Sequence, residues 1–141
     1  MTMVIAVARK ATWRQELMQY LGAVARTPLA FGTHDCALFA AGAVQAMTGQ
    51  DFAAPYRGRY TTMAGGLQLL QRDGHADHVA LARSVLPVVP AALAQPGDLA
   101  IIAMEPVAAL GVVQGAGIYV LDITGSLGLL PLTDATEALR V

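Results

Sequence analysis

The chain has 141 residues, a formal net charge of −1 and only 13% charged residues, against the ~25% usual in globular domains. This length fits one domain with one substantial core. The weak charge gives no electrostatic attraction toward nucleic acids or anionic membranes. We therefore predict no nucleic-acid partner.

Hydrophobic residues make up 55% of the chain, and the nearly uninterrupted apolar run at residues 99–121 approaches the length of a bilayer span. However, Glu105-Pro106 interrupts this run early, and no Lys or Arg flanks either end. Membrane helices usually carry such basic anchors. Buried strands explain the run better, so we predict no membrane span.

Two features bear on the compartment. The apolar stretch at the amino terminus precedes the charges of Arg9 and Lys10, whereas a secretory signal has its charges first. The single cysteine, Cys36, cannot form an internal disulfide and fits a reducing compartment or a functional thiol. We expect the chain to be cytoplasmic when made.

Residues 12 to about 90 show helical periodicity. Thr12 resembles an N-cap with Gln15 at the capping-box position, and the apolar spacing predicts a helix of about three turns that ends at Thr27-Pro28. The further helices predicted are Cys36 to about Met47, closed by Thr48-Gly49, then Thr61 or Thr62 to Asp73-Gly74, and about Asp77 to Val85.

From residue 97 onward, short apolar runs separated by Gly, Pro or Asp are typical of an antiparallel meander. These runs are Leu99–Met104, Leu110–Gln114, Gly117–Leu121 and Leu127–Leu132. Residues 4–8 are predicted as an edge strand or a packed arm, and a short helix is predicted after Thr133. Helices followed by strands predict one α+β domain, with its helical part at about 12–90 and its sheet at about 97–132.

The string Phe31-Gly32-Thr33-His34-Asp35-Cys36 places the thiol at the start of a helix. The helix dipole and the unpaired amides of the first turn favour a thiolate there, so the pKa of Cys36 should fall below its ordinary value. The same amides can hold an oxyanion. Alternatively, Cys36 shares an apolar stripe with Phe39 and Ala40 and is an ordinary core cysteine.

Gly32 followed by Asp35-Cys36 at the start of an Ala-rich helix resembles the nucleophile motif of NlpC-type cell-wall peptidases. Gly97-Asp98-Leu99 is similar to the Gly-Asp-Leu that enters the first core strand of that family. With Tyr56-Arg57-Gly58-Arg59-Tyr60, these motifs look most like a phage- and prophage-encoded branch of unknown function, over roughly residues 12–141. The resemblance implies a papain-like fold in which Cys36 is the nucleophile.

One landmark of that family is missing. Its next strand begins with the catalytic His two residues before a Gly, and alignment on Ala109-Leu110-Gly111 puts Ala109 at this position. No His follows His78. A cysteine peptidase needs an imidazole within hydrogen-bond reach of its thiol, so the resemblance implies a degenerate site or a substitute base.

Three histidines are candidates for that base. His34 is predicted as the substitute if the turn before Cys36 folds back, whereas His75 and His78 are interpreted as solvated residues around a helix start. A metal site made of Cys36 and the three His has suitable ligand types, but the spacing does not force them together. We predict no metal and no other cofactor.

The loop residues Tyr56, Arg57, Arg59 and Tyr60, together with Asp35, are the candidate binding residues. An Arg fork can bind a carboxylate or stack on a ring. Alternatively, the two Arg side chains tie the loop to helix ends while the Tyr rings cover the core.

Two functions are predicted. The first is a phage- or prophage-related structural or assembly protein of the tail, with a degenerate cysteine-peptidase site, other tail proteins as partners and a place in the particle. The second is an active thiol amidase or endopeptidase that acts on cell-wall peptides with Cys36 and a non-standard base.

Overall fold

Helices precede strands in the computed structural model, which describes residues 8–122 and 126–141. The helices are α1 (Trp13–Val24), α2 (Cys36–Thr48), α3 (Met63–Arg72) and α4 (His78–Val85), with 3-10 turns η1 (Ala91–Leu93) and η2 (Leu132–Asp134). The strands are β1 (Val88–Pro90), β2 (Leu99–Ile102), β3 (Ala109–Gln114), β4 (Gly117–Leu121), β5 (Leu127–Pro131) and β6 (Ala135–Leu139). The predicted α+β class and the four helices predicted between residues 12 and 90 are confirmed.

The strands form one antiparallel sheet in the order β1-β6-β2-β3-β4-β5. The predicted meander is therefore confirmed for β2 to β5. The helix predicted after Thr133 is wrong, because β6 fills the position between β1 and β2 and buries Ala138 and Leu139. The sheet thus extends beyond the predicted 97–132. The strand or arm predicted at 4–8 lies, except for Ala8, outside the described residues.

The caps of the first two helices differ. The Asp35 carboxylate accepts the amide of Leu38 at 2.9 Å, and Gly49 closes α2 with a left-handed φ of 83°. The capping box predicted at α1 is wrong: Thr12 accepts no amide with its side chain, and its hydroxyl donates instead to Glu16 at 2.7 Å.

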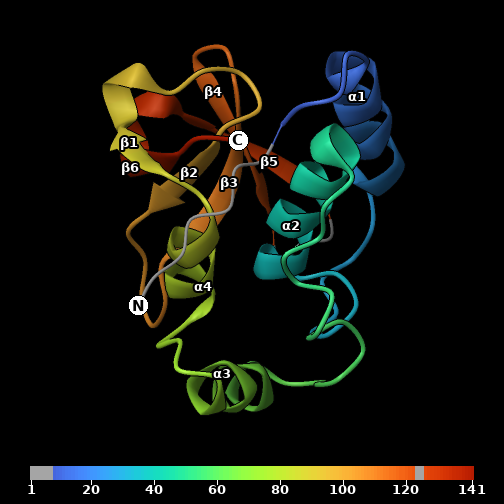
Figure 1. Cartoon of the computed structure of the whole chain (residues 1–141), viewed down its shortest axis with the longest axis vertical. Helices are drawn as coiled ribbons and strands as arrows, with labels where there is room; N and C mark the ends of the chain where they lie inside the picture. Colours follow the sequence, from blue (N-terminus) through green and yellow to red (C-terminus); the bar gives the residue numbers. More distant parts are fainter. Residues whose placement is uncertain (1–7, 123–125) are drawn as a thin grey trace.

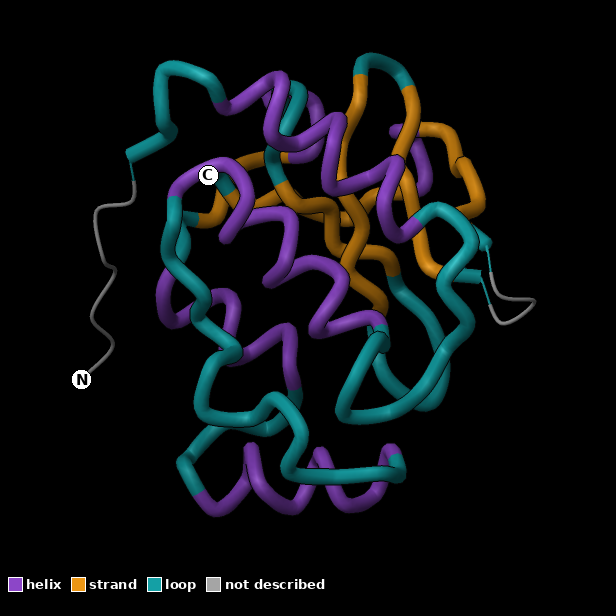
Figure 2. The backbone as a smooth tube through the Cα atoms, turned by 90° about the vertical axis from the view of Figure 1, so that its right-hand side faces the viewer, coloured by secondary structure: helices purple, strands orange, loops and turns teal. Residues whose placement is uncertain are grey.

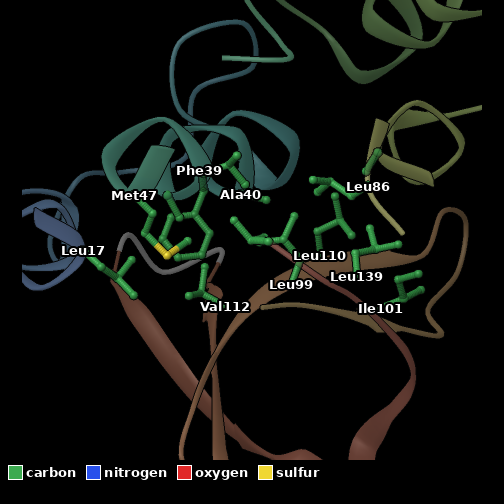
Figure 3. Packing of buried hydrophobic residues seen from close by; sticks show 14 of the residues in the cluster. Leu17, Phe39, Ala40, Met47, Leu86, Leu99, Ile101, Leu110, Val112 and Leu139 are labelled. Atoms are coloured by element: carbon green, nitrogen blue, oxygen red, sulfur yellow. The ribbon is translucent and has the colours of Figure 1, made fainter. Parts of the chain in front are cut away.

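The main core lies between α2 and one face of the sheet. Figure 3 shows Phe39, Ala40 and Met47 of α2 directed toward Leu110 and Val112 of β3, with further core residues around them. A second cluster occupies the other face, made by Ala100, Ile102, Val113 and Ile118. The two sets alternate along β2 and β3, as side chains on a strand must.

Helix α3 stands apart from the sheet. Figures 1 and 2 both place it at the bottom of the molecule, below α4 and at the opposite end from β4. The apolar run at residues 99–121 forms β2, β3 and β4. In the described part of the chain, no helix is long and apolar enough to cross a membrane.

Candidate functional site

Cys36 and His78 are each the first residue of a helix, and each follows an aspartate that caps it. Asp35 caps α2, and the Asp77 carboxylate accepts the amide of Ala80 at 2.8 Å to cap α4. The fold brings the two helix starts together although they lie 42 residues apart, with 3.7 Å between the Cys36 Sγ and the His78 Nε2. The interpretation of His78 as a solvated residue is therefore wrong.

Strand β3 supplies the other contacts of the thiol. The amide of Leu110 donates to the Cys36 Sγ at 3.0 Å, and the carbonyl oxygen of Leu110 lies 3.4 Å from the same sulfur. Cys36 also packs against the main core. The sulfur thus lies between the imidazole of α4 and the backbone of β3.

Burial decides the protonation of this pair. Burial raises the pKa of Cys36 to about 11, and the hydrogen bond from Leu110, which lowers this pKa, only partly offsets it. The lowered pKa expected from the helix start is therefore wrong. Burial also lowers the pKa of His78, against the raising effects of Asp77 and Asp35. At neutral pH the pair is a neutral thiol beside a neutral imidazole.

Asp35 positions the start of α2 and is only 4% exposed. Besides the Leu38 amide, its carboxylate accepts the amide of Gly32 at 3.0 Å and the phenol of Tyr60 at 2.5 Å. Burial and the Asp35 carboxylate raise the pKa of Tyr60. A Cβ on Gly32, whose φ is 86°, would lie 1.8 Å from the Tyr60 carbonyl oxygen, so only glycine permits this contact.

His34 does not meet the thiol in this structure. It is buried with its ring edge-on to Phe39, and its Nε2 has no hydrogen-bond partner among the described residues. Burial lowers the pKa of His34. The imidazole beside Cys36 is that of His78. The role of His34 as a base stays a prediction. No group of His, Cys, Asp and Glu in the described ranges could hold a metal ion.

The position aligned with the family's catalytic His, Ala109, faces away from the thiol. Its side chain packs with the second cluster, on the sheet face opposite α2, whereas Ala108 and Leu110 pack with the main core. An imidazole at 109 would point to the wrong face of the sheet to reach Cys36. The alanine at 109 therefore does not by itself deprive Cys36 of a base.

The Tyr/Arg loop is held within the fold. Arg57 binds Asp51 through two hydrogen bonds of 2.6 and 3.3 Å, and the phenol of Tyr56 donates to Asp73 at 2.7 Å. Arg59 is exposed and donates to the carbonyl of Pro55 at 3.4 Å. These contacts favour the structural interpretation of Tyr56, Arg57 and Tyr60.

A cavity of about 90 Å³ opens beside the thiol. It is lined by Cys36, Ala37 and His78 together with side chains from α3. The amides of Cys36 and Ala37 donate to no described residue, as expected for the first turn of a helix. The cavity thus has a thiol and an imidazole in its lining, together with the first two residues of α2.

A family model described as "Domain of unknown function (DUF6950)" matches residues 8–141. The chain belongs to this family. No curated protein matches it.

In this DUF6950 domain, the sequence pointed to the Cys36 thiol as a candidate site residue but not to the imidazole of His78 beside it. A local signal existed: Asp77-His78 at the start of α4 repeats the arrangement of Asp35-Cys36 at the start of α2. Both put a reactive group at the first helical position behind an aspartate cap. That parallel does not reveal that the two helix starts meet.

Proposed function

We propose that this domain is a thiol hydrolase of acyl compounds, in which Cys36 is the nucleophile and His78 the base. The observation that carries the proposal is the 3.7 Å contact between the Cys36 Sγ and the His78 Nε2 at the edge of a cavity. A thiol and an imidazole at this separation form the core of nucleophilic catalysis by cysteine. Amides of cell-wall peptides are the first substrates to test.

The protonation of the pair suits a base-assisted attack. His78 Nε2 takes the thiol proton as Sγ bonds to the acyl carbon, and the same nitrogen then returns the proton to the leaving amine. The free amides of Cys36 and Ala37 are the donors for the oxyanion. Water releases the acyl group from the thioester and restores the thiol.

We also propose that the fold is papain-like and of the NlpC type. Support comes from a helix that begins at the candidate nucleophile and packs on an antiparallel sheet, with Gly97-Asp98 leading into the first strand of its meander. The imidazole comes from a helix, α4, where that family is expected to supply it from a strand.

Hydrolysis of cell-wall peptides by the purified domain tests the proposal. Cys36→Ala should abolish turnover, and His78→Ala should reduce it by about 10²–10⁴-fold, the usual worth of general acid–base catalysis. His75→Ala is the matched control because it removes a nearby imidazole that does not touch Cys36, and it should leave the rate unchanged. If His34→Ala abolishes turnover and His78→Ala does not, the base is assigned wrongly.

The pH dependence of alkylation tests the state of the thiol. Because the pKa of Cys36 is raised to about 11, the rate of iodoacetamide labelling of the folded domain should climb steadily from pH 7 to pH 10. A rate that is already constant at neutral pH would show a preformed thiolate and contradict the neutral pair. Intact-mass spectrometry gives the rate directly, since Cys36 is the single cysteine.

A second candidate is a structural or assembly domain of a phage tail with a degenerate peptidase site. The second ring nitrogen of His78 favours it, because no described residue hydrogen-bonds that nitrogen and so orients the ring. This proposal expects no turnover with any acyl substrate and normal particle assembly in Cys36→Ala. Assembly that fails when the domain is deleted, together with mass spectrometry of purified particles, would establish it.

A further inference from the structure

The cavity beside Cys36 indicates which acyl groups the thiol can receive. We infer that the acyl part of the substrate is short, apolar and uncharged. This inference rests on the proposed function and adds the substrate class to it.

The walls of the cavity are mostly apolar. Helix α3 lines the cavity with Met63, Gly66, Leu67 and Leu70, and Phe31 and Val107 complete the apolar part. Apolar walls favour a group that loses no hydration on entry and penalise a polar one that finds no partner there.

The charge of the cavity lining points to the same class of acyl group. The lining contains no Lys or Arg, and Arg57 of the nearby loop is engaged with Asp51. The ionisable groups present are Asp35, Cys36, Tyr60 and His78, and Asp35 brings a negative charge. A carboxylate on the acyl group would enter an apolar space without a cation and close to an anion, which is costly.

The cavity is also small. Its volume of about 90 Å³ is below the ~150 Å³ of an apolar cavity that holds a benzene molecule, which suits a chain of about four carbons beyond the carbonyl. Gly66 marks one limit, since a Cβ there would lie 3.0 Å from the Tyr60 ring. Gly66 and the Tyr60 ring are therefore already in contact, and the cavity does not extend between them.

Matched 4-nitrophenyl esters separate charge from length. The pentanoyl and glutaryl esters have the same five-carbon acyl chain and differ in a terminal methyl or carboxylate, while the decanoyl ester is longer. The Cys36 Sγ attacks the carbonyl carbon, its proton passes to His78, and the bond to 4-nitrophenolate breaks. The acyl thioester adds its mass to the protein until water hydrolyses it, and both steps are measured by intact-mass spectrometry and nitrophenolate release.

The pentanoyl adduct should form at least about tenfold faster than the glutaryl and decanoyl adducts, the size of discrimination that apolar pockets give. Leu67→Ala should improve the decanoyl ester relative to the pentanoyl ester, and Leu67→Phe should slow both. Gln68→Phe is the control, because it adds the same ring to the exposed neighbouring position on α3 and should change neither.

The outcomes distinguish failure of the inferred acyl class from failure of the proposed hydrolase. Equal rates for the pentanoyl and glutaryl esters, or a decanoyl rate indifferent to Leu67, overturn the inferred acyl class and leave the thiol hydrolase in place. Neither an adduct nor nitrophenolate release with any ester, in protein whose Cys36 still reacts with iodoacetamide, overturns the hydrolase and the inference with it. An adduct that persists in Cys36→Ala has the same consequence.

Discussion

Two buried aspartates, Asp35 and Asp98, invite comparison because their local settings are alike. A glycine with positive φ precedes each: Gly32, at 86°, lies three residues before Asp35, and Gly97, at 90°, lies directly before Asp98. Each aspartate also accepts two backbone amides. Their exposures are 4% and 0%. On burial and capping alone the two motifs look equivalent.

They differ in what surrounds the carboxylate. Asp98 binds the guanidinium of Arg9 at 3.0 Å and accepts the amides of Gln95 and Val141, so it joins distant parts of the chain and has its charge balanced. Asp35 has only neutral donors among the described residues, and the thiol that follows it lines a cavity. A carboxylate balanced by a cation therefore characterises the structural motif at Asp98. A cavity next to the motif characterises the candidate site at Asp35.

The largest expected effect follows the loss of the Asp98 carboxylate. Asp98→Ala leaves Arg9 without its anion, the buried amide of Val141 without an acceptor and the part-buried amide of Gln95 likewise, so the free energy of unfolding should fall by about 3–5 kcal/mol. Urea denaturation measures it. The control, Glu137→Ala, removes the partner of the half-exposed Arg83 and should cost under about 1 kcal/mol. Equal losses in the two variants would refute a special role for Asp98.

An intermediate effect is expected at the helix caps. Asp35→Ala removes a cap and strands the Gly32 amide and the Tyr60 phenol, for a loss of about 2–4 kcal/mol. Asp77→Ala removes a single hydrogen bond, the one from the Ala80 amide, and should cost about 1 kcal/mol. Thermal melting with urea titration ranks the pair. A larger loss for Asp77→Ala would contradict the network drawn around Asp35.

The smallest effects concern the loop behind Asp35. Arg57→Ala should cost about 1 kcal/mol because it breaks the paired bonds to Asp51, whereas Arg59→Ala at an exposed position should stay within about 0.5 kcal/mol. The same urea titration reports both. If Arg59→Ala is the more damaging, the loop has a partner surface that these contacts do not explain.

Local patterns made much of this fold predictable. The start of α2 at Cys36, its end at Gly49 and the meander strands follow from residues close in sequence. Strand β6 was missed because Ala, Glu and Leu favour helices in isolation. The pairing of β6 with β1 and β2 overrides that preference, and no local pattern shows which strands it will join.

Only one of the two site residues was predictable. Cys36 could be found because the residues next to it indicate the start of a helix. Its contact with His78 depends on how α3 and the loop before α3 fold back. The direction of the pKa of Cys36 was misjudged for a related reason. The helix start is visible in the sequence, but the burial that outweighs it is a property of the packed chain.

The position of β6 between β1 and β2 sets the order in which the sheet can form. A nascent chain that ends at residue 134 carries β1 and β2 but not the strand that lies between them, so both keep an unpaired edge. Asp98 likewise waits for the amide of Val141. Folding on the ribosome can therefore complete the helices and the meander early, while the sheet closes only after Ala135–Leu139 have been synthesised. Until then, the two waiting edges are the part of this chain most exposed to pairing with another copy.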